Sequence, residues 1–203
     1  MASPQIHCLF HSSPTVAALL HSPAGRTIAG DLIVECAPAP ALGYVLSLET
    51  PANYPGLVGL LGGVDIASLA HATDRLPAPI VLAPGAMLVP GTMRAALALL
   101  QKADDRIQKF TLLVSCSYAA ALGAALAIAD KFTLAWDVSE LPHEELIDFA
   151  RWLGRERLVD RGDFEGVIAY ASQSVSATEA QRLTTLLAPL ATAAWPGAVI
   201  TLA

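Results

Sequence analysis

The sequence predicts a three-layer α/β/α fold built on a mostly parallel sheet. Short apolar segments alternate with Ala- and Leu-rich segments of helical length along the chain, which is the order of βα units. Several apolar segments are hydrophobic at every position, as strands covered by helices on both faces are. Lys109 to Asp130 shows both features, because an uncharged strand there leads into an Ala-rich helix. At 203 residues, the chain 1–203 is most simply one domain.

Strands are expected where apolar or β-branched residues run together between Pro, Gly or polar breaks. These segments are residues 6–10, 31–37, 44–48, 79–83, 110–114, 132–136, 164–171 and 198–202. The segment 31–37 also fits an extension of the helix before it. Residues 51–63 are rich in Gly and Pro, and we expect a loop with a short strand or turn there.

Helices are expected where good helix formers follow a residue that can cap the first turn. These segments are residues 15–21, 65–72, 92–104, 118–129, 141–157 and 178–194. Ser13, Thr92 and Ser176 are the expected N-caps of three of them, and Pro14 fits the first turn of the first helix.

The composition indicates a folded chain with an apolar surface. Hydrophobic residues make up 54% and charged residues 15%, with a mean hydropathy of +0.53. This excludes disorder and favours a subunit interface, so a homodimer is expected. The net charge of −6 argues against direct contact with nucleic acid, which requires clustered Lys and Arg.

The three cysteines follow no metal-binding pattern, and no metal is expected. Their odd number and the missing secretory signal indicate reduced thiols in the cytoplasm. No apolar run approaches the about 20 residues of a membrane span. The sequence also contains no GxGxxG, P-loop or GxSxG motif, so no nucleotide or other cofactor is expected and a Ser hydrolase is not supported.

Cys116 is the candidate catalytic residue, at the junction between the central strand and its helix. The helix N-terminus favours a thiolate there, but an inert buried thiol explains Cys116 equally well. Trp136 and Asp137 end a neighbouring strand and are candidates for lining a ligand site. Tyr118 either donates its hydroxyl to that ligand or fills a disused pocket. Cys8 and Cys36 are expected in the core.

Three segments resemble the ThiJ/PfpI superfamily, also called class I glutamine amidotransferase-like, whose fold is flavodoxin-like. They are PIVLAPGA (79–86), LLVSCSYAAAL (112–122) and KFTLAW (131–136), and they are most similar to the N-terminal domain of AraC-type transcription regulators. The resemblance implies that Cys116 is the thiol of a nucleophile elbow. It also implies that N–H groups near Gly85, Ala86 and Ser117 would stabilise an oxyanion.

The sequence departs from that family at the groups that handle protons. Tyr118 stands where the family has Gly, Ala135 stands where it has His, and residues 12–22 contain no acid. Without an adjacent base, the helix terminus alone would activate Cys116. Cys–His catalysis of the usual kind is therefore expected to be impaired.

Three functions remain open from the sequence. The first is a degenerate ThiJ/PfpI-like domain that senses a small molecule or a partner, like the ligand-binding half of a regulator. The second is a Cys116-dependent hydratase, amidase or glyoxalase-like enzyme, and the third is a structural assembly subunit. A caspase-like pair of Cys116 with His71, 45 residues earlier, is a weaker alternative.

Overall fold

The fold was obtained as a computed structural model, which leaves several segments undescribed. It describes residues 3–11, 15–37, 46, 48, 56–84, 89–116, 118–137, 139, 148–149, 151–152, 155, 163–170, 176–179, 181–182, 185, 188 and 200–202.

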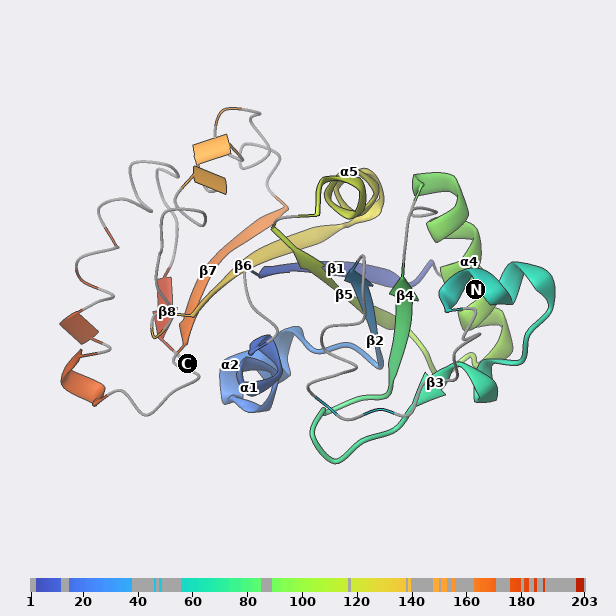
Figure 1. The fold of residues 1–203 in the computed structure, drawn as a ribbon, viewed down its shortest axis with the longest axis horizontal. Helices are drawn as coiled ribbons and strands as arrows, with labels where there is room; N and C mark the ends of the chain where they lie inside the picture. The colour runs from blue at the N-terminus through green and yellow to red at the C-terminus, as the bar shows by residue number, and fades with distance from the viewer. Residues whose placement is uncertain are drawn as a thin grey trace.

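The described strands form one 8-stranded sheet in the order β3-β4-β2-β5-β1-β6-β7-β8 (Figure 1). All neighbouring pairs are parallel except β3 and β4. The strands are β1 (Gln5–His11), β2 (Leu32–Ala37), β3 (Ala70–His71), β4 (Ile80–Pro84), β5 (Lys109–Ser115), β6 (Lys131–Asp137), β7 (Phe164–Tyr170) and β8 (Ile200–Leu202). The mostly parallel sheet confirms the predicted architecture.

Helices cover both faces of this sheet, which makes three layers (Figure 1). The helices α1 (Val16–His21) and α2 (Pro23–Ile28) pack on one face. The 3-10 helix η1 (Leu57–Gly62), α4 (Pro90–Ala103) and α5 (Ala119–Ile128) pack on the other. The described residues between 148 and 155, and between 177 and 188, are also helical.

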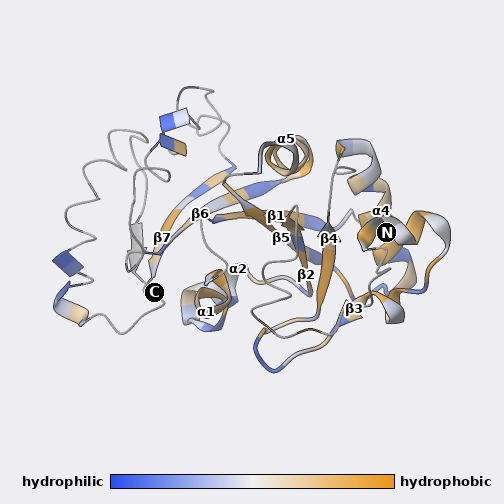
Figure 2. Ribbon diagram, viewed as in Figure 1, coloured by the Kyte–Doolittle hydropathy of each residue, from blue (hydrophilic) through white to orange (hydrophobic). Residues whose placement is uncertain are grey.

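The strands are buried on both faces because the helices leave little of the sheet exposed. β2 is buried along its whole length, β5 is buried except at its two ends, and β6 is buried except at Lys131. Figure 2 shows hydrophobic colouring on these central strands and on parts of the helices that cover them. Phe10 of β1 packs edge-on against Phe132 and Phe149, so aromatic contacts join β1, β6 and the segment that follows β6.

Three local predictions were wrong. The expected helix 65–72 is a 3-10 turn, η2 (Ile66–Ser68), followed by β3. The helix α2 was not expected; Ser22 begins it by accepting a hydrogen bond from the Gly25 N–H at 3.0 Å. Helix α4 begins at Pro90 with Val89 as its N-cap, and not at Thr92.

Two further predictions are tested only in part. Of the expected strand 44–48, Leu46 lies in a turn and Leu48 is outside any strand, and the other residues lie outside the described part. Ser13 and Pro14 also lie outside it, but the N-cap of α1 is Thr15, so the expected Ser13 cap is wrong. The Ser176 cap is confirmed, because its Oγ accepts from the Glu179 N–H at 3.1 Å.

The path of the chain through the sheet has a switch point at β1. After β1 the chain crosses to β2 on one side, and after β5 it crosses to β6 on the other. In open parallel sheets, ligands bind outside the carboxyl ends of the strands where the connections part in this way. The functional site is therefore sought where β1, β5 and β6 end.

Candidate functional site

A buried carboxylate, Asp137, ends β6 at the switch point. The Asp137 residue is 1% exposed, and its neighbour in the parallel register of β7 is Tyr170. Thr15 lies directly before α1 as its N-cap. The structure thus brings the ends of β6 and β7 and the start of α1 to one place.

Asp137 accepts hydrogen bonds on both carboxylate oxygens. Thr15 Oγ1 donates to Oδ2 at 2.8 Å, and the Ser139 N–H donates to Oδ1 at 2.9 Å. The Ser139 hydroxyl donates to the same Oδ1 at 2.5 Å. A buried carboxylate needs such donors, because burial without them would be costly.

The Tyr170 hydroxyl extends this network. It lies 3.2 Å from Thr15 Oγ1. A hydroxyl has one hydrogen to donate, and Thr15 donates its hydrogen to Asp137, so Tyr170 must be the donor to Thr15. The order of donation is therefore Tyr170 to Thr15 to Asp137. We call Thr15, Asp137, Ser139 and Tyr170 the switch-point network.

Asp137 was predicted from the sequence as a ligand-site residue, whereas Thr15, Ser139 and Tyr170 were missed. The available signal was the position of Tyr170 at the last residue of an apolar strand. Pairing it with Thr15 required the strand order, because the two residues are 155 positions apart.

Cys116 directly follows β5 and is half-buried. Its N–H donates to the His11 carbonyl at 2.8 Å, and its side chain packs against the core cluster on the α4 and α5 side. Cys8 and Cys36 are fully buried as predicted, and burial raises the pKa of both thiols.

The proposed pairing of Cys116 with His71 is wrong. His71 lies on β3 at the edge of the sheet, with β4 and β2 between it and β5. Three strand spacings amount to about 14 Å, which is far beyond hydrogen-bond reach. Within the described residues there is also no group of three or more His, Cys, Asp or Glu suited to a metal.

The structure describes only part of the other predicted site residues. Trp136 is 2% exposed and lies in the α4-side core, and Tyr118 is the half-buried N-cap of α5. Gly85, Ala86 and Ser117 lie outside the described residues.

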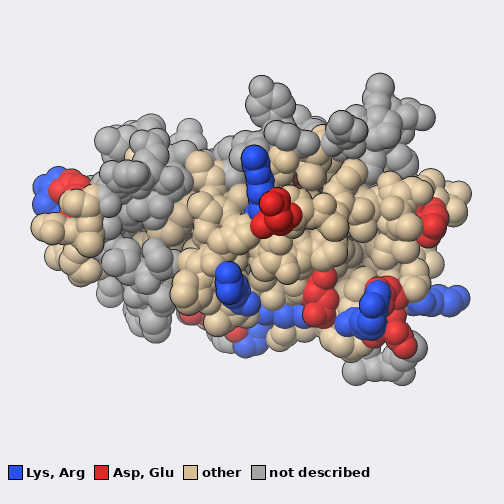
Figure 3. Space-filling model, turned by 90° about the horizontal axis from the view of Figure 1, so that it is seen from below, with Lys and Arg blue, Asp and Glu red and all other residues tan. Residues whose placement is uncertain are grey.

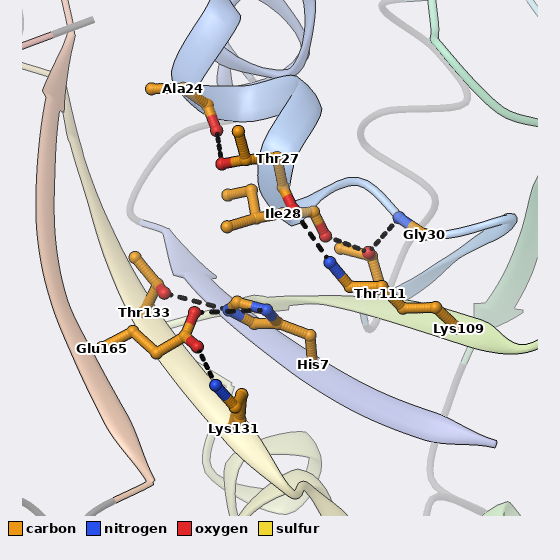
Figure 4. A network of polar contacts seen from close by, with 10 residues as sticks. All are labelled: His7, Ala24, Thr27, Ile28, Gly30, Lys109, Thr111, Lys131, Thr133 and Glu165. Carbon is orange, nitrogen blue, oxygen red and sulfur yellow. Dashed lines mark hydrogen bonds and ion pairs between the residues drawn. The ribbon is translucent and has the colours of Figure 1, made fainter.

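A second polar network lies at the opposite, amino edge of the sheet (Figure 4). His7 Nε2 is 2.9 Å from Thr133 Oγ1, and His7 Nδ1 is 3.7 Å from Glu165 Oε2. Glu165 also pairs with Lys131. Lys109 donates to the Thr27 carbonyl at 3.0 Å, which ties β5 to α2.

Burial dominates the electrostatics of this amino-edge network. It lowers the pKa of His7 from 6.5 to about 4, against the opposing charge of Glu165. Burial would raise the pKa of Glu165, but the hydrogen bond from Lys131 and the neighbouring positive charges lower it overall. His7 is thus a neutral, structural histidine near neutral pH.

No family model and no curated protein matches the sequence. Solved structures do match the fold. Cobyrinic acid a,c-diamide synthase from Mycobacterium smegmatis with bound ADP and magnesium has a TM-score of 0.61 and 18% identity, over 91% of this chain and 82% of that one. Apo McdA from Cyanothece has a TM-score of 0.57 and 16% identity, over 97% and 84%. The MinC:MinD cell division complex from Aquifex aeolicus has a TM-score of 0.60 and 16% identity, over 96% and 79%.

These matches correct the family expected from the sequence. The neighbours are ATPases of the ParA, MinD and McdA type and cobyrinic acid synthases, so the resemblance to ThiJ/PfpI proteins and AraC-type regulators is wrong. Without that resemblance, no basis remains for three interpretations that depended on it. They are the nucleophile elbow, the degenerate sensing domain and the Cys116-dependent hydratase, amidase or glyoxalase. At such identities the likeness concerns the fold.

The residues at the switch point do not fit a magnesium nucleotide such as the one bound to cobyrinic acid a,c-diamide synthase. A P-loop needs Gly-x-x-x-x-Gly-Lys-Ser/Thr between the strand and the helix, whereas only Ser12-Ser13-Pro14-Thr15 stand between β1 and α1. Neither Lys nor Arg occurs there, or in residues 116–118 and 138–139 after β5 and β6. The Thr15 hydroxyl is engaged with Asp137.

Proposed function

We propose that this chain keeps the fold of the ParA- and MinD-type ATPases but does not hydrolyse ATP, and that it works by binding a protein partner. The observation that carries the proposal is the connection between β1 and α1. It supplies neither the glycine-rich backbone that cradles phosphates nor the lysine that neutralises them. Pro14 in addition removes one backbone N–H from this short connection.

The surface supports binding between apolar faces. The large hydrophobic residues most exposed in the described part are Leu61 (46%), Val89 (52%) and Leu99 (38%). All three belong to η1, to α4 or to its N-cap, and η1 and α4 pack on each other. Helix α5, on the same side of the sheet, carries no charged residue. The opposite side, seen in Figure 3, carries Lys and Arg beside Asp and Glu at several places.

The simplest partner is a second copy of the chain, docked through Val89 and Leu99. Light scattering after gel filtration, at several protein concentrations, tests this. We expect a dimer for the unchanged chain and a monomer for Val89→Asp and Leu99→Asp. The matched control is Arg26→Asp on α2, an exposed position on the opposite face. A monomer at every concentration would exclude self-association.

Phosphate release from magnesium ATP, together with the fluorescence of a labelled ATP analogue, tests the loss of hydrolysis. We expect no release above the protein-free blank and no saturable binding at millimolar nucleotide. Magnesium-dependent release that co-purifies with the folded chain would refute the proposal.

The second candidate function is an ATPase that uses a different phosphate-binding arrangement. The observation in its favour is the bound ADP and magnesium, or ATP analogue, of the cobyrinic acid synthases with this fold. The same two assays decide between the candidates.

Within the described residues, no helix has the length and the apolar character needed to cross a bilayer.

A further inference from the structure

The switch-point network places a buried carboxyl group, that of Asp137, at the carboxyl ends of the strands, where open parallel sheets bind their ligands. In sheets of this kind, an anionic ligand sits beside the start of the helix that follows the first strand. Here that helix is α1, and Thr15, its N-cap, donates to the Asp137 carboxylate at 2.8 Å. The Thr15 hydroxyl thus links the Asp137 carboxylate to the residue that directly precedes α1.

The donors around Asp137 converge on it as they would on a bound anion. The Thr15 hydroxyl, the Ser139 N–H and the Ser139 hydroxyl all donate to its two oxygens within 2.9 Å. Two of these donors are side chains, and Tyr170 stabilises one of them by donating to Thr15. Since the carboxylate is buried, these bonds are protected from competition by water.

The same charge opposes a second anion. A phosphate brought next to a buried carboxylate would meet like-charge repulsion in a medium of low dielectric constant. The segments after β1, β5 and β6 contain no Lys or Arg to offset that repulsion.

We propose that Asp137 is a built-in substitute for the bound phosphate, which holds α1 and the ends of β6 and β7 together without any ligand. The chain then keeps one conformation whether or not nucleotide is present. This inference rests on the proposed loss of nucleotide hydrolysis and extends it to the regulation of the same site. Its consequence is a partner-binding state that is constitutive.

Chemical rescue tests the inference. Asp137→Ala removes the carboxylate, leaves the three donors and opens a space, whereas Asp137→Asn removes the charge but fills the space. Both variants should melt about 5 to 10 °C below the unchanged chain, because hydrogen bonds to a charged acceptor are lost. Asp148→Asn, at an exposed carboxylate paired with Arg151, is the matched control and should melt within about 1 °C of it.

Sodium formate or phosphate is then added and compared with sodium chloride of equal ionic strength. At 100 mM, either anion should raise the melting temperature of Asp137→Ala by about 3 to 5 °C more than chloride, as expected for a dissociation constant of about 10 mM. The unchanged chain, Asp137→Asn and Asp148→Asn should gain nothing beyond chloride. If Asp137→Ala does not fold, its refolding yield from urea with formate against chloride gives the same readout.

The outcomes separate the two proposals. An Asp137→Ala variant that formate and phosphate do not rescue, or that melts with the unchanged chain, overturns the substitute-anion role even if no ATP binds. Stabilisation of the unchanged chain by magnesium ATP overturns the proposed function, whatever the variants do.

Discussion

The stability of the fold should fall between pH 6.5 and pH 5 because of one histidine, His7. Burial, together with the charges of Lys109 and Lys131, lowers its pKa to about 4, although Glu165 opposes the shift. In the unfolded chain the pKa returns to about 6.5. Between the two values the unfolded state binds the extra proton, so acidification favours unfolding.

The size of the effect follows from the two pKa values. With about 4 in the folded state and about 6.5 in the unfolded state, the free energy of unfolding at pH 5 is about 2 kcal/mol below its value at pH 7.5. That is a large part of the stability of a typical domain, about 5–15 kcal/mol. The lowered pKa of Glu165 adds its own loss only at more acidic pH, as the carboxylate becomes protonated.

Urea unfolding at pH 7.5, 6.5, 5.5 and 5.0 measures this, with His7→Gln as the perturbation. Glutamine cannot take up the proton, so the difference between pH 7.5 and pH 5 should shrink by about 2 kcal/mol. His21→Gln, at an exposed histidine of α1, is the matched control and should keep the dependence of the unchanged chain. If His7→Gln and His21→Gln show the same pH dependence, His7 is not the titrating group.

Two further predictions concern packing and thiol reactivity. Gly25→Ala should prevent folding or lower the melting temperature sharply, because the added Cβ would lie 1.9 Å from a backbone carbonyl oxygen of α1. Gly123→Ala should instead stabilise α5 by about 0.5–1 kcal/mol, because nothing lies within 4 Å of a Cβ there. Thermal unfolding of both variants measures the difference, and equal effects would contradict the close approach at Gly25. In the native protein, a disulfide reagent should label Cys116 first, and should label Cys8 and Cys36 only after unfolding. Burial raises the pKa of the Cys8 and Cys36 thiols, which lowers their reactivity. Simultaneous labelling of all three cysteines would contradict the burial of Cys8 and Cys36.

The strands were predictable from the sequence because burial on both faces leaves a simple local pattern. β4, β5 and β6 follow apolar runs, and β2 and β7 follow apolar runs that are each interrupted by one glutamate, Glu35 or Glu165. Short elements that depend on caps and contacts were not predictable in the same way. Residues 65–72 have a helix-compatible composition, but pairing of β3 with β4 selects an extended form at Ala70 and His71.

The site was predictable only in part because its residues meet through the order of the strands. Asp137 stands out locally as an acid at the end of an apolar strand, but Thr15 and Tyr170 join it from distant segments. The family resemblance failed for a related reason. A buried strand followed by a small residue and a helix recurs in parallel α/β folds of many families, so the run around Cys116 could not specify one family.

The two flanks of the sheet have a consequence for how copies of this chain meet. In the described residues one flank is β3, with 2 residues that run antiparallel, and the other is β8, with 3 residues. Such short flanking strands offer few main-chain N–H and C=O groups with which a strand of a neighbouring molecule could pair. In a protein with 54% hydrophobic residues, such flanks disfavour fibrils built by strand pairing. Contacts between copies of the chain would then be made by side chains.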